Sequence, residues 1–251
     1  MSKRHEAIGI KQVIRIEWMQ KAANLLLVGL DAKAIRQELH EFLADRKGSG
    51  SEDERSDKTR TFVVNNLMNI WVSPDPGLIS FRDALLVFLR EHSSMALAVH
   101  WAMVSAVYPF WFNVARQTGR LLTLQEQVTQ TQIINRLKEQ YGDRQTVFRY
   151  ARYVLRSFVA WGVLKDSKAK GCYEKDTPVS IAHTNLAILM IESALLATPE
   201  AKGALGLLLN NSAFFPFRLP VMNGSFVSQY SDRIDILQHG LDDELLRLKG
   251  N

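Results

Sequence analysis

Residues 144–161 read RQTVFRYARYVLRSFVAW, and this stretch decides the fold of the middle of the chain. If each residue advances 100° around a helix, the apolar residues fall within about 100° of one another, the width of a core-facing stripe. These residues are Val147, Ala151, Val154, Leu155 and Phe158. Within about 40° of one another on the opposite face lie four long polar side chains: Gln145, Arg149, Arg152 and Arg156. The sequence therefore predicts a helix with three guanidinium groups on one exposed side.

The residues before this helix predict a strand and a first helix. LLTL at 121–124 has the length and composition of a short strand. Thr129 can cap a helix that runs to about Tyr141, and Gly142 is suited to end that helix. Asp143 is then the expected N-cap of the basic helix.

Beyond the basic helix the apolar pattern changes to that of a β-hairpin. Residues 163–165 and 172–181 bracket the polar tip DSKAKG, which contains a glycine. Strand, helix, turn, helix and basic hairpin follow one another in the order of a winged helix-turn-helix. In that motif the second helix enters the DNA major groove and the hairpin lies along the backbone. We therefore expect a mainly α protein with this unit, residues 120–181, at its centre and the small β-hairpin as its wing.

The side chains of this unit suit double-stranded DNA. A guanidinium group can chelate guanine O6 and N7 or two phosphate oxygens, and a lysine at the hairpin tip acts as a point charge on phosphate. The expected contact residues are Arg144, Gln145, Arg149, Arg152, Arg156, Lys165, Lys168 and Lys170. Two alternatives stay open: the arginines solvate a helix face, or they pair with acids of another protein. None of the three helix arginines has a carboxylate four residues away, as a solvated salt-bridge face usually would.

Positive charge is concentrated in the same region. The chain has 251 residues and a formal net charge of +5. Residues 120–175 hold 11 basic groups and five acidic groups, so this segment alone carries an excess of six positive charges. All other residues together have a net charge of −1. Such asymmetry favours a polyanionic partner.

The first 119 residues are predicted to form a helical domain. Apolar residues recur at helical spacing through residues 10–26, and a second helix with Ile35 and Leu39 on one face completes a helical hairpin. Residues 46–60 contain no apolar side chain and therefore predict a mobile surface loop.

The most apolar stretch of the chain is MALAVHWAMVSAVYPFWF at 95–112. Its length approaches that of a membrane span, but His100, Ser105 and Pro109 favour a buried central helix that is broken near the proline. The first residues lack the apolar core of a signal peptide, and the single Cys172 suits a reducing compartment. We therefore expect a cytoplasmic protein without a membrane span.

Residues 182–251 are predicted to form a helical and extended region that packs on the core. NLAILMIESALLA at 185–197 indicates another buried helix, and FFPFRLPV at 214–221 an extended segment. The last residues predict an amphipathic final helix with Leu241, Leu245 and Leu248 on one face. This C-terminal region is therefore expected to be rich in helix.

Motifs for catalysis are missing from the sequence. It contains no phosphate-binding glycine loop, no dinucleotide-binding glycine fingerprint, no H-E-x-x-H and no G-x-S-x-G. The six histidines show no metal-ligand spacing, and no acid–base relay accompanies Cys172. We expect no catalytic residue, metal or cofactor, and hence a protein that is not an enzyme.

The layout resembles that of the BrxA family of BREX phage-defence systems. The shared features are a helical N-terminal region, the buried apolar stretch WAMVSAVYPFWF, a central winged helix with a basic second helix, and a further C-terminal portion. The resemblance implies a non-enzymatic DNA-binding component of bacterial antiviral defence that works with methyltransferase and ATPase partners. From the residues alone, a sequence-specific transcriptional repressor and a protein-interaction scaffold in a larger assembly stay open, as does the oligomeric state.

Overall fold

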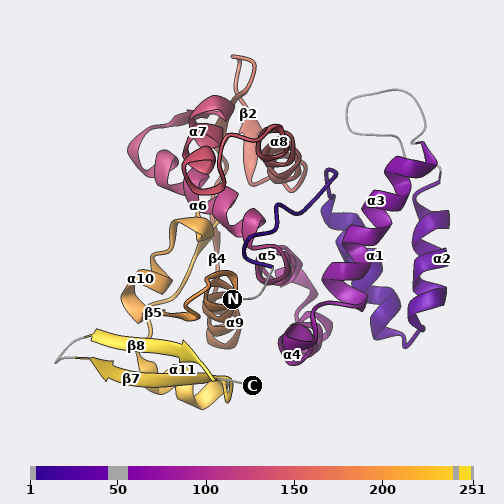
Figure 1. Ribbon diagram of the computed structural model, residues 1–251. Coiled ribbons are helices and arrows are strands. Elements are labelled where there is room, and N and C mark those ends of the chain that lie inside the picture. Colours follow the sequence, from indigo (N-terminus) through magenta and orange to yellow (C-terminus); the bar gives the residue numbers. More distant parts are fainter. Residues whose placement is uncertain (1–3, 45–55, 240–242, 250–251) are drawn as a thin grey trace.

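The computed structural model describes residues 4–44, 56–239 and 243–249, and it is mainly helical with small sheets (Figure 1). This confirms the expected mainly α fold class. The N-terminal helices are α1 (Ile16–Leu27), α2 (Ala32–Phe42), α3 (Asp57–Leu67) and α4 (Ile79–Glu91). Short helical turns join them: η1 (Met68–Val72), η2 (Pro76–Leu78) and η3 (Ser93–Met95). These helices lie on one side of the molecule, and the C-terminal region lies on the other (Figure 1).

The predicted loop over residues 46–60 is wrong at its end. Helix α3 begins at Asp57, because the Ser56 hydroxyl accepts a hydrogen bond from the backbone N–H of Thr59. The polar residues that suggested a loop form the first turn of this helix, and its buried face starts only at Val63. Residues 45–55, where the rest of the predicted loop falls, lie outside the described residues.

The apolar stretch forms two helices in the centre of the molecule. Helix α5 (Ala96–Val107) ends two residues before Pro109, which is the first residue of α6 (Pro109–Leu124), so the predicted break at the proline is confirmed. Proline fits the first helical turn because a backbone N–H at that position has no partner within the helix, so nothing is lost when proline lacks it. Among the described residues no single helix has both the length and the apolarity to cross a membrane; α5 with its η3 turn and α6, which are bent by 117°, meet that test only as a pair.

A three-stranded antiparallel sheet and two helices follow α6. The elements are β1 (Gln127–Thr129), α7 (Gln130–Tyr141), α8 (Gln145–Ala160), β2 (Leu164–Asp166) and β3 (Cys172–Lys175). The strand order is β1-β3-β2, with Val128 opposite Tyr173 and Lys165 opposite Glu174. The two helices occur where the sequence predicts them, and the hairpin does so in part. Its second strand ends at Lys175 and does not continue to Ile181, because Val179–Ser180 pair in parallel with Phe217–Arg218.

Local chemistry explains the start and end of α7. Thr129 accepts a hydrogen bond from the backbone of Gln132, and the Gln132 side chain accepts one from the backbone of Thr129, so both orphan groups are satisfied. The helix ends at Gly142, whose φ of 79° suits glycine. The predicted cap and the predicted stop are both confirmed.

Two expectations around these helices are wrong. LLTL is the last turn of α6, because Leu121 and Leu122 face the core and the Thr123 hydroxyl donates to the carbonyl of Gly119 four residues before. The strand begins later, at Gln127. Asp143 does not cap α8, since Arg144 occupies the N-cap position and Asp143 forms an ion pair with Lys138 at 2.8 Å.

The C-terminal region is mixed rather than rich in helix. Its helices are α9 (Thr184–Ala197), α10 (Leu205–Leu209) and α11 (Gly224–Tyr230), with a turn η4 (Ser212–Phe214). One of its sheets pairs β6 (Phe217–Arg218) with β4 (Val179–Ser180), a strand that comes from the predicted winged unit 120–181. The other holds β5 (Lys202–Ala204), β8 (Asp243–Leu248) and β7 (Ile234–His239) in that order. The predicted final helix is therefore wrong over Asp243–Leu248, because this leucine-rich stretch pairs with strands on both sides. Leu241, the first leucine of the predicted helix face, lies outside the described residues.

The predicted regions share one continuous hydrophobic core. Its buried residues come from the N-terminal helices, from α7 and α8, and from the C-terminal region. The proposed boundary at 119/120 falls inside α6. At that point a Cβ on Gly119 would lie 1.9 Å from the carbonyl oxygen of Ser212, so only glycine lets α6 approach the η4 turn this closely.

Helix α8 is fixed to the N-terminal segment by two side chains. The Ser157 hydroxyl accepts a hydrogen bond from the backbone N–H of Ile14 at 2.9 Å, and the Trp161 indole donates to the carbonyl of Ile14 at 2.9 Å. Phe158 stacks on Trp101 of α5 with ring centroids 4.9 Å apart. The basic helix therefore stands on the common core and not on a separate module.

Candidate nucleic-acid interface

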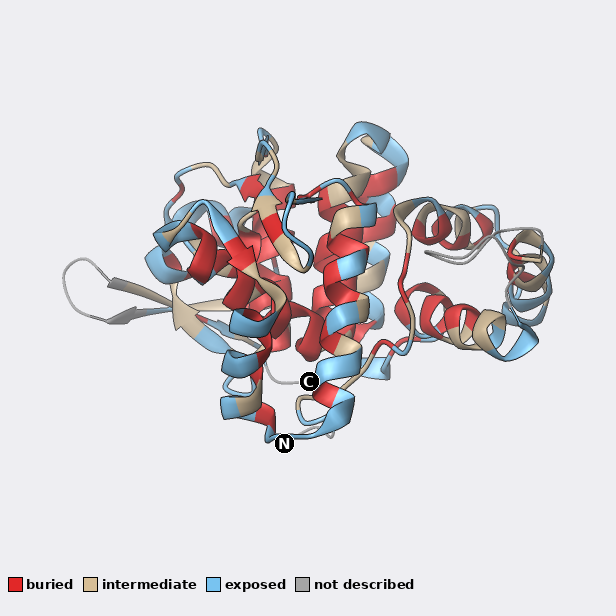
Figure 2. Cartoon of the chain, turned by 90° about the horizontal axis from the view of Figure 1, so that it is seen from above, coloured by how far each residue is buried: buried red, intermediate tan, exposed pale blue. Residues whose placement is uncertain are grey.

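The exposed face of α8 carries the predicted polar residues. Gln145, Arg149, Arg152 and Arg156 are all exposed, whereas the five apolar residues of the predicted stripe are completely buried. Figure 2 shows this division along the helix, with exposed residues on the side away from the core. The amphipathic pattern is therefore confirmed at the level of burial.

A groove lies between α8 and the β2–β3 hairpin. Its volume is about 670 Å³. Arg152 and Arg156 line it from α8, and Lys168 and Lys170 line it from the hairpin tip. The start of α7 contributes Thr129, Gln130 and Thr131. Of the eight predicted contact residues, the structure thus brings four into one groove.

Two of the helix arginines have no carboxylate partner among the described residues. Arg149 makes no ion pair there, and the Arg152 guanidinium lies 5.7 Å from the ring centroid of Phe148. Phe148 is itself an exposed apolar side chain. These two cations are therefore available to an anion from outside the chain.

Arg156 is held inside the groove by a carboxylate. Its guanidinium lies 2.5 Å from Oδ1 of Asp166 on β2. This hydrogen bond is the main cause that raises the pKa of Arg156. The helix offers Arg156 no partner, as expected, but the hairpin does, because the fold places the first strand after α8 beside the end of that helix.

Two predicted contact residues are engaged elsewhere. The Arg144 guanidinium donates from Nε at 3.0 Å and from a terminal nitrogen at 2.7 Å to the carbonyl of Tyr141, which closes the end of α7. Lys165 forms an ion pair with Asp176 at 2.8 Å. That hydrogen bond is the main cause that lowers the pKa of Asp176.

Sequence reasoning did not single out Asp166, Gln130 or Tyr173 in the groove. The Tyr173 hydroxyl lies 3.5 Å from Oε1 of Gln130, and burial raises the pKa of Tyr173. Tyr173 alternates with Cys172 and Glu174 in β3, so the strand pattern marks it as an inward residue. That pattern could not place Gln130, because the contact joins segments 43 residues apart.

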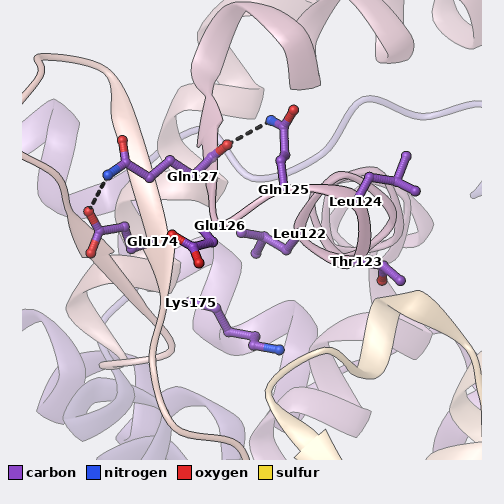
Figure 3. Close-up of a pocket in the computed structure, with 8 residues that line it drawn as sticks. All are labelled: Leu122, Thr123, Leu124, Gln125, Glu126, Gln127, Glu174 and Lys175. Carbon is purple, nitrogen blue, oxygen red and sulfur yellow. Dashed lines mark hydrogen bonds between the residues drawn. The ribbon is translucent and has the colours of Figure 1, made fainter.

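A second hollow opens at the end of α6, beside β1 and β3, and has a volume of about 550 Å³. Figure 3 shows the residues that line it. Glu126 and Glu174 line it together with Lys175, and the Gln127 side chain donates to Glu174 at 2.8 Å. Two carboxylates against one lysine make this hollow unsuited to phosphate.

The described residues contain no group of three or more His, Cys, Asp and Glu side chains that could hold a metal ion. The His92 and His183 rings lie with their centroids 4.4 Å apart and their planes tilted by 39°, and both rings contact Phe88. In comparisons with known proteins, no family model, curated protein or solved structure matches the chain.

Proposed function

We propose that β1, α7, α8, β2 and β3 form a winged helix-turn-helix that binds double-stranded DNA without catalysing a reaction. The observation that supports this most is the groove between α8 and the hairpin, which gathers Arg152, Arg156, Lys168 and Lys170 against one carboxylate, Asp166. An excess of cations around a groove attracts a polyanion, and the order of elements is that of the motif.

In this proposal α8 lies in the major groove. Arg149 and Arg152, with Gln145, reach base edges or the flanking phosphates, because guanidinium and amide groups can each make two hydrogen bonds to a base. Lys168 and Lys170 at the hairpin tip contact phosphate as point charges and carry no sequence information. Arg156 exchanges Asp166 for a phosphate oxygen when a DNA phosphate enters the protein groove between α8 and the hairpin.

The biological setting follows from the resemblance to BrxA. We propose that the protein acts in the bacterial cytoplasm as an accessory component of a BREX-like phage-defence system. It would bring its DNA-binding surface to methyltransferase and ATPase partners of that system. In this setting the chemistry on DNA belongs to the partners.

The first test is the salt dependence of DNA binding. With about six phosphate contacts, the affinity for a duplex should fall about 10³-fold between 50 and 200 mM salt, because each contact releases counterions. Fluorescence anisotropy with a labelled duplex measures this directly. Affinity that does not change with salt, or no binding at 50 mM salt, would contradict the proposed function.

Asp166→Asn is expected to strengthen DNA binding several-fold. The variant removes the carboxylate from the groove and frees Arg156 for phosphate. The slope of log affinity against log salt concentration should therefore become steeper by the amount that corresponds to about one added phosphate contact. Both side chains of the pair are about half exposed, so breaking it costs at most about 1 kcal/mol of stability.

Asp143→Asn is the matched control for this variant. It also removes one paired, exposed carboxylate of the same unit, but Asp143 does not line the groove. Anisotropy titrations of the two variants at several salt concentrations make the comparison. Weaker binding by Asp166→Asn, or equal gains in both variants, would contradict the role given to Asp166.

A further inference from the structure

A second surface lies at the end of α6, away from the groove. Leu124 is the last residue of that helix, and 80% of it is exposed. On one side of Leu124 is a hollow of about 390 Å³, which we call the Leu124 notch. It is lined by Arg120, Leu121, Thr123, Leu124, Arg136 and Ser212. None of these residues lines the groove of α8.

Positive charge gathers beside this apolar notch. Arg120 and Arg136 are exposed and form no ion pair with any described residue. Arg116, one turn before Arg120, has its pKa lowered by burial and then by the charge of Arg120. The Arg116 Nε is buried without a hydrogen-bond partner, and Glu200 is the carboxylate that acts on this arginine from a distance.

This arrangement suits a partner of mixed character. Two cations without an ion pair and a large exposed apolar side chain lie around one hollow. A partner that carries both a carboxylate and an apolar side chain can pair with the first and bury the second. A nucleic acid offers phosphates to the arginines but leaves Leu124 with little to bury it, so the apolar lining favours a protein partner.

The two glutamates at the end of α6 limit the side from which an acidic partner can approach Leu124. Thr123 and Leu124 line both the notch and the hollow that holds Glu126 and Glu174. Figure 3 shows the Leu124 side chain pointing away from these two carboxylates. An acidic segment is therefore repelled on the side of the carboxylates and attracted on the side of Arg120 and Arg136. The surface has a polarity that a symmetric basic patch would lack.

We propose that the Leu124 notch binds an acidic segment of another protein. An apolar side chain of that segment packs on Leu121 and Leu124, and its flanking carboxylates pair with Arg120 and Arg136. The site is separate from the DNA-binding groove, so it leaves α8 and the hairpin free. The proposal does not depend on the proposed function.

A random-sequence peptide display library, selected on the folded full-length protein, provides the probe. The enriched peptides are expected to carry carboxylates on either side of a large apolar residue. Affinity of the enriched peptides should fall at least about tenfold for Leu124→Ser and for Arg120→Glu with Arg136→Glu, as for central anchors of interfaces. Val221→Ser, at a residue that is 98% exposed, is the matched control and should leave affinity unchanged.

Three results would overturn the proposal. The enriched peptides could lack acidic residues, they could bind the notch variants as tightly as the wild-type protein, or they could lose affinity equally in Val221→Ser. The remaining alternative is that the notch contacts nucleic acid, and a duplex titration of the variant with Arg120→Glu and Arg136→Glu tests it. If that variant loses DNA affinity and no acidic peptide is enriched, the notch is a nucleic-acid contact.

Discussion

Replacing Arg149, Arg152 and Arg156 together with alanine is expected to weaken duplex binding about 100-fold or more at low salt, while the protein stays folded. Each guanidinium lost from a base or phosphate contact costs about 1–3 kcal/mol, and the salt dependence flattens as phosphate contacts disappear. The fold should survive because all three side chains are exposed and the buried stripe is unchanged. Anisotropy titrations and circular dichroism measure the two outcomes.

A charge-matched control makes this result specific. Lys33, Lys58 and Lys249 are exposed, lie outside 120–175 and form no ion pair among the described residues. Replacing these three with alanine removes the same total charge and should change affinity far less. If the two triple variants lose affinity equally, net charge and not the α8 face causes the binding. Wild-type affinity in the arginine variant would reject the face outright.

Arg233→Ala is expected to lower the free energy of unfolding by about 3–5 kcal/mol, the usual cost of leaving a buried charge without its partner. Arg233 makes two hydrogen bonds to the carboxylate of Glu192, from Nε at 2.6 Å and from a terminal nitrogen at 2.8 Å. Only 2% of the Glu192 side chain is exposed. The pair joins α9 to the start of β7, so its loss also loosens the C-terminal sheet from the core.

The loss should depend on pH. Burial raises the pKa of Glu192 even with Arg233 present, and removing Arg233 raises that pKa further. A carboxyl whose folded-state pKa is raised favours folding when protonated, so the deficit is largest above the folded pKa. The deficit shrinks as pH falls toward the ordinary value of 4.5. Urea unfolding near pH 8 and near pH 5.5 should therefore give different deficits.

Arg247→Ala is the control on the same sheet. Arg247 pairs with Asp235 at 3.2 Å, and half of the Arg247 side chain is exposed, so its loss should cost less than about 1 kcal/mol. Changing Glu192 and Arg233 together to methionine should restore part of the stability, because no uncompensated charge is left. An Arg233→Ala deficit that is equal at both pH values would contradict a buried, uncompensated carboxylate as its cause.

The sequence predicts those parts of the fold that depend on neighbouring residues. Thr129 and Gly142 mark the ends of α7 because capping and a positive φ are local requirements. The stripe of α8 follows from helical periodicity alone, and Phe158 is fully buried as expected. Local rules are therefore sufficient for both ends of α7 and for the buried face of α8, but not for the N-cap of α8, where Arg144 takes the position predicted for Asp143.

Contacts between distant segments decide the rest. The leucines of β8 fit a helical spacing and a strand equally well, and only pairing with β5 and β7 makes Leu246 an inward strand residue. Likewise, nothing near Arg156 in the sequence of its helix indicates Asp166, which becomes its partner only when the hairpin folds back. The sequence could therefore predict the cations that line the groove, but not the carboxylate of Asp166 that lies among them.

The two hydrogen bonds between α8 and Ile14 have a thermodynamic consequence. A rotation of α8 must either carry the chain at Ile14 with it or break both bonds, since Ser157 and Trp161 hold the two backbone groups of one residue. The orientation of α8 and the position of the segment that leads into α1 are therefore linked variables. A ligand that reorients α8 therefore also shifts the segment at Ile14. By reciprocity, a second ligand that shifts this segment changes the affinity of α8 for the first ligand by the same factor by which the first changes the affinity for the second.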